Sequence, residues 1–143
     1  MKRILVVTVA GVVGALAAFA ATTWYALEAG GIAVVETRAP DGSTRETHVW
    51  YAEPDGELWL EAGSPENPWF ADARREGRLT LRADGRKGDY AVAVFEDPEP
   101  RERIRAALRA KYGWRDRWVG LFVDQAKSLV VRLTPAAGAK PGI

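Results

Sequence analysis

The 143-residue sequence contains no cysteine and only one histidine, His48. The absence of cysteine excludes a disulfide framework, a thiolate zinc site and a thiol nucleophile. The single histidine excludes metal sites built from several histidines, and it leaves His48 open to a structural role or to proton donation. The net charge is +1, and no run of Lys or Arg occurs, so we expect no nucleic-acid partner.

Charge is also missing from a long stretch near the N-terminus. No charged residue occurs from Ile4 to Leu27, enough chain to cross an apolar layer of about 30 Å as a helix. Three interpretations stay open: an uncleaved membrane anchor, a signal peptide cleaved near Ala18–Ala20, and a buried core helix. The run is longer than the apolar part of a typical signal peptide, about 7–15 residues. Trp24 and Tyr25 lie where interfacial aromatic residues are expected, so we favour the anchor.

The charges on either side of this run predict its orientation. Lys2 and Arg3 precede the run, and Glu28 is the first charge after it. The positive-inside rule therefore places the N-terminus in the cytoplasm. Residues 1–29 are predicted to be a membrane anchor or signal segment, and the rest of the chain is predicted to lie on the extracytoplasmic side.

The remainder of the chain alternates between strand patterns and turn signals. Runs of β-branched and alternating apolar residues predict strands. Pro-Asp-Gly at Pro40–Gly42 and Pro54–Gly56, and Asp-Gly at Asp84-Gly85, predict turns between them. The predicted strands span residues 32–38, 44–52, 57–62, 78–83, 86–95 and 128–134, and the predicted helices span residues 68–75, 98–112 and 114–122.

Six strands joined by short turns, with no βαβ alternation, predict a mainly β fold with short helices (α+β). We expect a six-stranded antiparallel barrel whose openings are covered by helices, preceded by one transmembrane helix. The barrel domain is expected to span residues 30–135. Residues 136–143, rich in Pro, Gly and Ala, are expected to form a flexible tail.

The longest predicted helix and the segment after it carry a dense group of aromatic and charged residues. An apolar stripe through Ile104, Leu108 and Tyr112 implies that Arg105 and its neighbours Arg101 and Arg109 face outward. The aromatic-rich segment that begins at Lys111 has two interpretations. It is either a pocket wall with Tyr112 as proton donor or a helix corner packed on the barrel.

Residues 64–75 form the corner that most suggests a binding site. A Gly/Ser turn and two prolines follow a strand and start a helix. Free backbone N–H groups and the helix dipole at such a corner favour an anion. The backbone N–H groups of Gly63 and Ser64 are therefore candidate phosphate donors, with a plain structural turn as the alternative.

The hairpin at residues 37–45 is predicted to supply positive charge to this corner. Arg38 and Arg45 flank its turn, and each guanidinium can bind a phosphate in bidentate fashion. The hydroxyl groups of Ser43 and Thr44 add further donors. The alternatives are solvated surface charges and ordinary turn chemistry.

Three segments resemble elements of the split β-barrel flavin-binding superfamily. Thr37–Arg45 is similar to its basic hairpin, and Glu61–Ser64 is similar to its small-residue segment after the third strand. Asn67–Phe70 is similar to its Pro-Trp helix start, and Arg78–Leu81 follows as the next strand. The resemblance covers residues 32–134. It extends to the pyridoxamine-phosphate-oxidase-like proteins and to the deazaflavin-dependent nitroreductase/quinone reductase family.

This resemblance implies a flavin-type cofactor, a deazaflavin coenzyme or FMN, that performs hydride transfer itself. It also implies a homodimer. The predicted function is a membrane-anchored oxidoreductase that transfers hydride to a quinone-like or other lipophilic acceptor. The alternative is a non-catalytic module of the envelope that binds a ligand or a protein. The residues assigned to cofactor binding are Arg38, Ser43, Thr44, Arg45, Gly63, Ser64 and Trp69, with Trp69 open also to a core role, and Tyr112 is the candidate proton donor.

Overall fold

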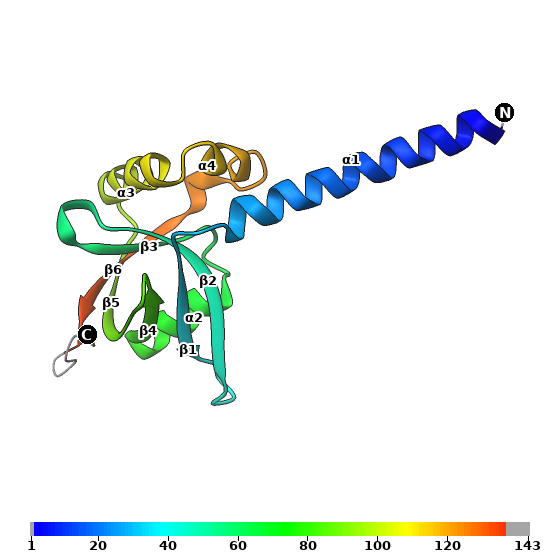
Figure 1. Ribbon diagram of the computed structural model, residues 1–143. Coiled ribbons are helices and arrows are strands. Elements are labelled where there is room, and N and C mark those ends of the chain that lie inside the picture. The colour runs from blue at the N-terminus through cyan, green and yellow to red at the C-terminus, as the bar shows by residue number, and fades with distance from the viewer. Residues whose placement is uncertain (1, 137–143) are drawn as a thin grey trace.

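The computed structural model describes residues 2–136, with side chains from Val6 onward. Its first element, helix α1 (Lys2–Glu28), projects away from the rest of the molecule (Figure 1). Over Val6–Glu28 the helix is long and apolar enough to cross a membrane, with a mean hydropathy of 2.0, and its most apolar window is not buried. The predicted apolar N-terminal helix is confirmed. The interpretation as a core helix is wrong because the apolar side chains lie outside the protein.

Six antiparallel strands form a closed barrel in the order β1-β2-β3-β6-β5-β4. The pairing of β1 with β4, centred on Val35 and Leu81, closes the barrel. The predicted six-stranded antiparallel barrel is therefore confirmed (Figure 1). The strands are β1 (Ile32–Arg38), β2 (Thr44–Ala52), β3 (Leu58–Ala62), β4 (Arg78–Ala83), β5 (Arg86–Phe95) and β6 (Leu129–Pro135).

The turn residues explain most of the element boundaries. Asp84 and Gly85 have φ of 48° and 73°, and a type I′ hairpin turn requires positive φ at both positions. Strand β3 begins one residue later than predicted because a 3₁₀ turn, η1 (Pro54–Gly56), holds Glu57 through a hydrogen bond to the carbonyl of Pro54. A second 3₁₀ turn, η2 (Gln125–Lys127), precedes β6.

Helix α2 (Pro68–Glu76) packs against the residues of the barrel interior. Trp69, Phe70 and Ala73 join the core cluster formed by the inward side chains of the strands. The helix ends at Gly77, whose φ of 67° is the left-handed conformation of a helix C-cap. This end confirms the glycine stop that the sequence predicts.

Helices α3 (Pro98–Tyr112) and α4 (Trp114–Val119) cover the outside of the barrel (Figure 1). Ile104, Leu108 and Tyr112 of α3 form a second core cluster against strands β2, β3 and β6. Trp59 alternates with the inward-facing Leu58 and Leu60 of β3, yet it is only 2% exposed because this second cluster covers it. Helix α4 ends at Val119, three residues before the predicted end.

The barrel is closed, but its strand pairing is incomplete on one side of β2. Thr44 to Trp50 pair with β1 along their whole length. Strand β3 pairs with β2 only at Tyr51 and Ala52. Among residues 2–136, the first part of β2 therefore has no strand partner on its second edge, and this opening positions the candidate site.

The predicted division of the chain at residues 29/30 and 135/136 stays a prediction. The backbone N–H of Ala136 donates a hydrogen bond to the carbonyl of Asp89 at 2.9 Å. The rest of the predicted flexible tail, residues 137–143, lies outside the described residues.

Candidate functional site

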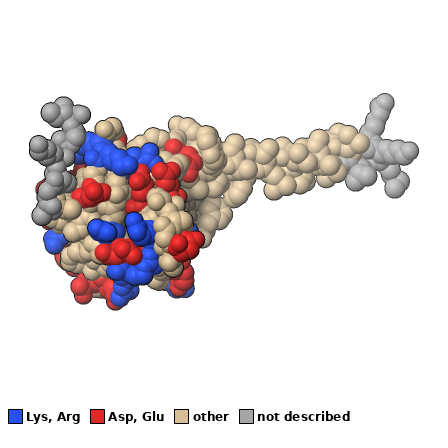
Figure 2. Space-filling model, turned by 90° about the horizontal axis from the view of Figure 1, so that it is seen from below, with Lys and Arg blue, Asp and Glu red and all other residues tan. Residues whose placement is uncertain are grey.

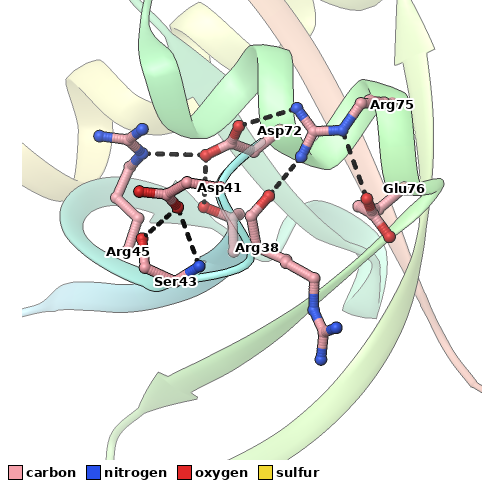
Figure 3. Close-up of polar contacts among 8 residues, drawn as sticks. Arg38, Asp41, Ser43, Arg45, Asp72, Arg75 and Glu76 are labelled. Atoms are coloured by element: carbon pink, nitrogen blue, oxygen red, sulfur yellow. Dashed lines mark hydrogen bonds and ion pairs between the residues drawn. The ribbon is translucent and has the colours of Figure 1, made fainter.

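The predicted basic hairpin and the predicted helix corner meet in space. Their contact is centred on Asp72 of α2, which is 2% exposed (Figure 3). Its carboxylate accepts hydrogen bonds from Arg45 Nε at 2.9 Å, Arg75 Nη1 at 3.1 Å and Thr37 Oγ1 at 3.3 Å. Two segments separated by almost thirty residues are thus joined by one buried carboxylate.

The charges of this cluster balance, because its two arginines face two carboxylates: Asp72, and Glu76, whose Oε1 lies 3.3 Å from Arg75 Nε. Burial alone would raise the pKa of Asp72, but the hydrogen bonds and charges of Arg45 and Arg75 outweigh burial and hold that pKa below 3.8. Asp72 therefore stays ionised and neutralises one of the two guanidinium groups. The side chains of Arg45 and Arg75 remain 38% and 41% exposed. Arg75 donates to Asp72, to Glu76 and to the carbonyl of Arg38, whereas Arg45 bonds Asp72 through Nε alone, so Arg45 is the residue that can bind an anion from solvent.

The two arginines of the hairpin do not converge on one point. The register pairs Arg38 with Thr44 and Thr37 with Arg45. Residues opposite each other lie on the same face of a hairpin and neighbours along a strand lie on opposite faces, so Arg38 and Arg45 face opposite sides. In Figure 3 the guanidinium of Arg38 points away from Asp72. The structure therefore places the guanidinium of Arg45, but not that of Arg38, next to the helix corner, where the backbone carbonyl of Arg38 accepts a hydrogen bond from Arg75.

The remaining predicted phosphate donors are mostly engaged in local structure. Ser43 donates through its hydroxyl and its backbone N–H to Asp41 Oδ1, at 2.6 and 2.9 Å. Thr44 is exposed on the face shared with Arg38. The hydroxyl of Ser64 donates to Glu66. These contacts support the interpretation of both segments as ordinary structural turns.

The start of α2 offers fewer free donors than a helix start normally does. Pro68 has no backbone N–H, and the N–H groups of Phe70 and Ala71 both donate to the carbonyl of Asn67. The side chain of Asn67 makes no capping hydrogen bond. The guanidinium of Arg45, rather than the helix end, is therefore the feature of this corner that favours an anion.

A cavity of about 310 Å³ lies beside this corner, at the incomplete side of β2. It brings together two of the predicted site residues, Gly63 and Trp69, with His48. It does not include Tyr112 or the hairpin turn. Its lining comes from the end of α1, strands β2 and β3, the start of α2, helices α3 and α4 and the segment before β6: Leu27, Glu28, Thr47, His48, Val49, Trp50, Glu61, Gly63, Asn67, Trp69, Arg105, Asp116, Val119, Val123, Gln125 and Ser128.

A buried ionic network forms one wall of the cavity. Arg105 donates from Nη1 to Glu61 Oε2 at 2.7 Å and from Nη2 to Asp116 Oδ1 at 2.6 Å. The side chains of Arg105, Glu61 and Asp116 are 7%, 10% and 3% exposed. One guanidinium thus faces two carboxylates, and the wall carries a net negative charge. The expectation that Arg105 faces outward is wrong.

One oxygen of this network has no partner. Glu61 Oε1 is buried and accepts no hydrogen bond within the described part of the chain. A buried acceptor without a donor costs about 1–3 kcal/mol. A ligand that presents an N–H or O–H group in the cavity could satisfy it.

His48 and Glu28 lie at the rim of the cavity. Nδ1 of His48 and Oε2 of Glu28 are 2.5 Å apart, which ties the end of α1 to β2. The imidazole remains about half exposed. A carboxylate on one ring nitrogen fixes the ring orientation and leaves the other nitrogen to face a ligand.

Tyr112 lies in the core rather than in the cavity. It is 4% exposed, and its hydroxyl donates to the carbonyl of Gly31 at 2.5 Å and accepts from the N–H of Tyr51 at 3.2 Å. Burial raises the pKa of Tyr112 to about 12. Its ring stacks on Trp50 with centroids 4.3 Å apart. The geometry supports the packing interpretation, and proton donation by Tyr112 stays a prediction without geometric support.

The sequence pattern did not identify Asp72, Arg105 and Asp116 as site residues. For Asp72 and Arg105, the helical spacing from a buried neighbour indicated burial. Asp72 follows Trp69 by three positions, which puts it on the buried face of the helix. Arg105 precedes Tyr112 by seven positions, so both lie on the same side of α3. Only the partner segments reveal that these charged residues are buried, because each partner lies far away in the sequence.

The sequence matches the family model described as "Uncharacterized protein conserved in bacteria (DUF2255)" over residues 28–133. No curated protein sequence matches significantly. Solved structures with a similar fold include a conserved hypothetical protein from Mycobacterium tuberculosis (22% identity, covering 79% of this chain and 77% of that one, TM-score 0.59). Another is HutZ, the heme storage protein from Vibrio cholerae (11% identity, covering 81% of this chain and 89% of that one, TM-score 0.59). A third, from Clostridium acetobutylicum, is described as related to general stress protein 26 of the pyridoxinephosphate oxidase family (14% identity, covering 77% of this chain and 78% of that one, TM-score 0.55). The chain therefore shares the split-barrel fold of the pyridoxamine-phosphate-oxidase-like proteins.

Proposed function

We propose that this chain, which belongs to the DUF2255 family, holds a flavin-type cofactor in the cavity beside β2 and transfers hydride to a small lipophilic acceptor such as a quinone. The observation that carries this proposal is the cavity itself, which opens where β2 lacks a strand partner. Apart from Leu27, all of its lining lies within the matched residues 28–133. The bound cofactor, FMN or a deazaflavin coenzyme, would supply the hydride chemistry.

The residues present fit the ring of such a cofactor. Ligand pockets measure about 300–1,000 Å³, so a cavity of about 310 Å³ suits a planar ring better than a whole cofactor. Trp69, Val49 and Val123 supply apolar walls. Glu61 Oε1, which is buried and unpartnered, supplies an acceptor for a ring N–H.

The Asp72 cluster fits the phosphate of the same cofactor. Arg45 lies on the face of β2 that carries Thr47, and Thr47 lines the cavity. Two residues along a strand span about 7 Å, so a tail that leaves the cavity along β2 would reach Arg45. Arg45 bonds Asp72 through Nε, so its terminal guanidinium nitrogens are left to bind a phosphate.

Helix α1 would hold this domain at the membrane. Its length and apolar composition suit either an anchor or a signal sequence. We assign it as an uncleaved anchor with the barrel on the extracytoplasmic side, because Lys2 and Arg3 precede the apolar run. A homodimer, as implied by the family resemblance, is part of the same proposal and can be measured by light scattering in detergent.

Fluorescence titration of the purified chain with FMN, a deazaflavin coenzyme and riboflavin tests cofactor binding. We expect FMN or the deazaflavin to bind at micromolar concentration and riboflavin, which lacks the phosphate, to bind at least tenfold more weakly. Arg45→Ala should weaken FMN binding about tenfold, and Arg45→Lys should restore part of it. Arg38→Ala is the matched control, because Arg38 faces the opposite side of the hairpin. If neither cofactor binds, or if Arg38→Ala and Arg45→Ala have equal effects, the proposed site is wrong.

A second candidate function is non-catalytic binding of heme at the same cavity. His48 favours it, since its Nδ1 is held by Glu28 and its other ring nitrogen can serve as an axial ligand. One similar structure is described as a heme storage protein. Titration with hemin should then give a shifted Soret band that His48→Ala abolishes, whereas an unshifted band would exclude this candidate.

A further inference from the structure

Helix α4 and the residues after it pack against the apolar part of α1. Phe19 of α1 lies 5.6 Å, between ring centroids, from both Trp118 and Phe122. Trp118 Nε1 donates a hydrogen bond to Thr23 Oγ1 at 3.1 Å. The barrel domain is thus attached to the side of α1 as well as to its end.

These contacts fix the depth of α4 relative to any membrane that α1 crosses. An apolar layer of about 30 Å requires about 20 helical residues, and the candidate span is Val6–Glu28. Every stretch of that length within Val6–Glu28 contains both Phe19 and Thr23. The side chains that touch these two residues therefore lie at the level of the apolar layer or its boundary, wherever the span begins.

The side chains at this level are the exposed apolar residues of the domain. Leu121, Phe122 and Trp114 are 71%, 59% and 46% exposed. Trp114 stacks on Tyr25 of α1, with centroids 6.2 Å apart. Contiguous exposed apolar surface marks an interaction site. Trp114, Trp118, Leu121 and Phe122 form what we term the α4 surface.

The charges near the α4 surface suit a lipid headgroup region. Arg117 is exposed on α4 and has no ion-pair partner within the described chain. Such a cation beside aromatic residues favours anionic headgroups. On the face shown in Figure 2, Lys, Arg, Asp and Glu mix over the barrel, whereas the projecting α1 carries none of them between its grey end and the barrel.

We propose that the α4 surface is a second membrane-contacting element that seats the domain on the lipid bilayer beside α1. The inference rests on the proposed role of α1 as an anchor. Val119, Val123 and Leu27, which adjoin this surface, also line the cavity. The cavity therefore has a wall at the bilayer boundary, and its substrate class is lipophilic molecules that arrive laterally from the membrane.

Depth measurement with spin labels tests this proposal on the full chain. The chain has no cysteine, so a single introduced one is labelled uniquely. Leu121→Cys and Phe122→Cys probe the α4 surface. Glu102→Cys is the matched control, because it is exposed on α3, the helix that lies farther from α1 than α4 does (Figure 1). Each labelled chain is reconstituted into vesicles of phosphatidylcholine and phosphatidylglycerol, and its accessibility to oxygen and to a water-soluble nickel chelate is measured.

The outcomes separate the inference from the proposed anchor. We expect labels at positions 121 and 122 to be at least fivefold more accessible to oxygen than to the chelate, and the label at position 102 to show the reverse. Equal chelate access at all three positions, in chains that float with the vesicles, would overturn the α4 surface while the anchor stands. Labels shielded from both reagents would overturn it in favour of a second protein copy. A chain that does not float with vesicles would refute the anchor, and with it the basis of this inference.

Discussion

The residue that most shapes the candidate site is Asp72, a carboxylate that joins two segments and tunes their charge. It is almost fully buried and accepts from Arg45, Arg75 and Thr37. Without it, the two guanidinium groups would repel each other, and the hairpin would keep the hydrogen bond from Arg75 to the carbonyl of Arg38 but lose the contacts of Arg45 and Thr37 with α2. It is thus the structural condition for an anion site at this corner.

Asp72→Asn should lower the free energy of unfolding by about 1–3 kcal/mol at neutral pH, because charge-assisted hydrogen bonds are lost. The pKa of Asp72 is lowered in the folded state, so its stabilisation is present above pH 3.8 and is lost as the pH falls through the folded pKa. The difference between wild type and Asp72→Asn should therefore shrink below about pH 4. Urea unfolding in detergent at several pH values measures it. Glu102→Gln, at an exposed position, is the control, and a difference that grows in acid would contradict this account.

Arg105 is the second residue on which the site depends, since its guanidinium is paired with both carboxylates of the cavity wall. Arg105→Met should destabilise the fold by about 3–5 kcal/mol, because Glu61 and Asp116 are left buried without a cation. Arg109→Met, on the exposed side of the same helix, should change stability by less than about 0.5 kcal/mol. Thermal unfolding followed by circular dichroism compares them. Equal effects would show that the network does not stabilise the fold.

At the level of elements, the glycines that end helices and turns set the boundaries of the barrel. Gly77 has φ of 67°, and a Cβ added there would meet nothing within 4 Å. Gly63 has no such φ, and its Cβ would lie 3.5 Å from Val123, an ordinary contact. Alanine at Gly77 therefore tests the cost of backbone strain, and alanine at Gly63 tests the cost of a tighter side-chain contact.

Gly77→Ala should destabilise the fold by about 1 kcal/mol, since only the left-handed backbone is unfavourable for alanine. Gly63→Ala should be nearly neutral. Chemical unfolding of both variants measures the difference. A larger loss for Gly63→Ala would mean that space, rather than backbone conformation, limits these positions.

The elements themselves could be predicted from the sequence more completely than the site. Turn residues such as Asp84-Gly85 and the helix stop at Gly77 act locally, so they mark boundaries without knowledge of the fold. Burial of Arg105 or Trp59 depends on which distant strand or helix packs over it. The position of Arg38 depends on strand register, which the alternating pattern of a short hairpin does not fix on its own.

For the molecule as a whole, the barrel presents a cavity with an anionic wall close to the end of an apolar helix, and the exposed guanidinium of Arg45 lies on the same face of β2 as Thr47 in the cavity lining. A cofactor whose ring donates hydrogen bonds would suit the anionic wall, and its phosphate tail would suit the guanidinium. The same arrangement places the cavity near the membrane that α1 is proposed to cross. Cofactor binding in this cavity is therefore the central claim.

Blocking the cavity tests this claim most directly. Gly63→Leu would extend a side chain past Val123 into the cavity, whereas Gly63→Ala would make only an ordinary contact there. We predict that FMN or the deazaflavin binds at least tenfold more weakly to Gly63→Leu than to Gly63→Ala, by fluorescence titration, while the melting temperatures of the two stay close. Equal affinity of the two variants, with both folded, would contradict the placement of the cofactor in this cavity.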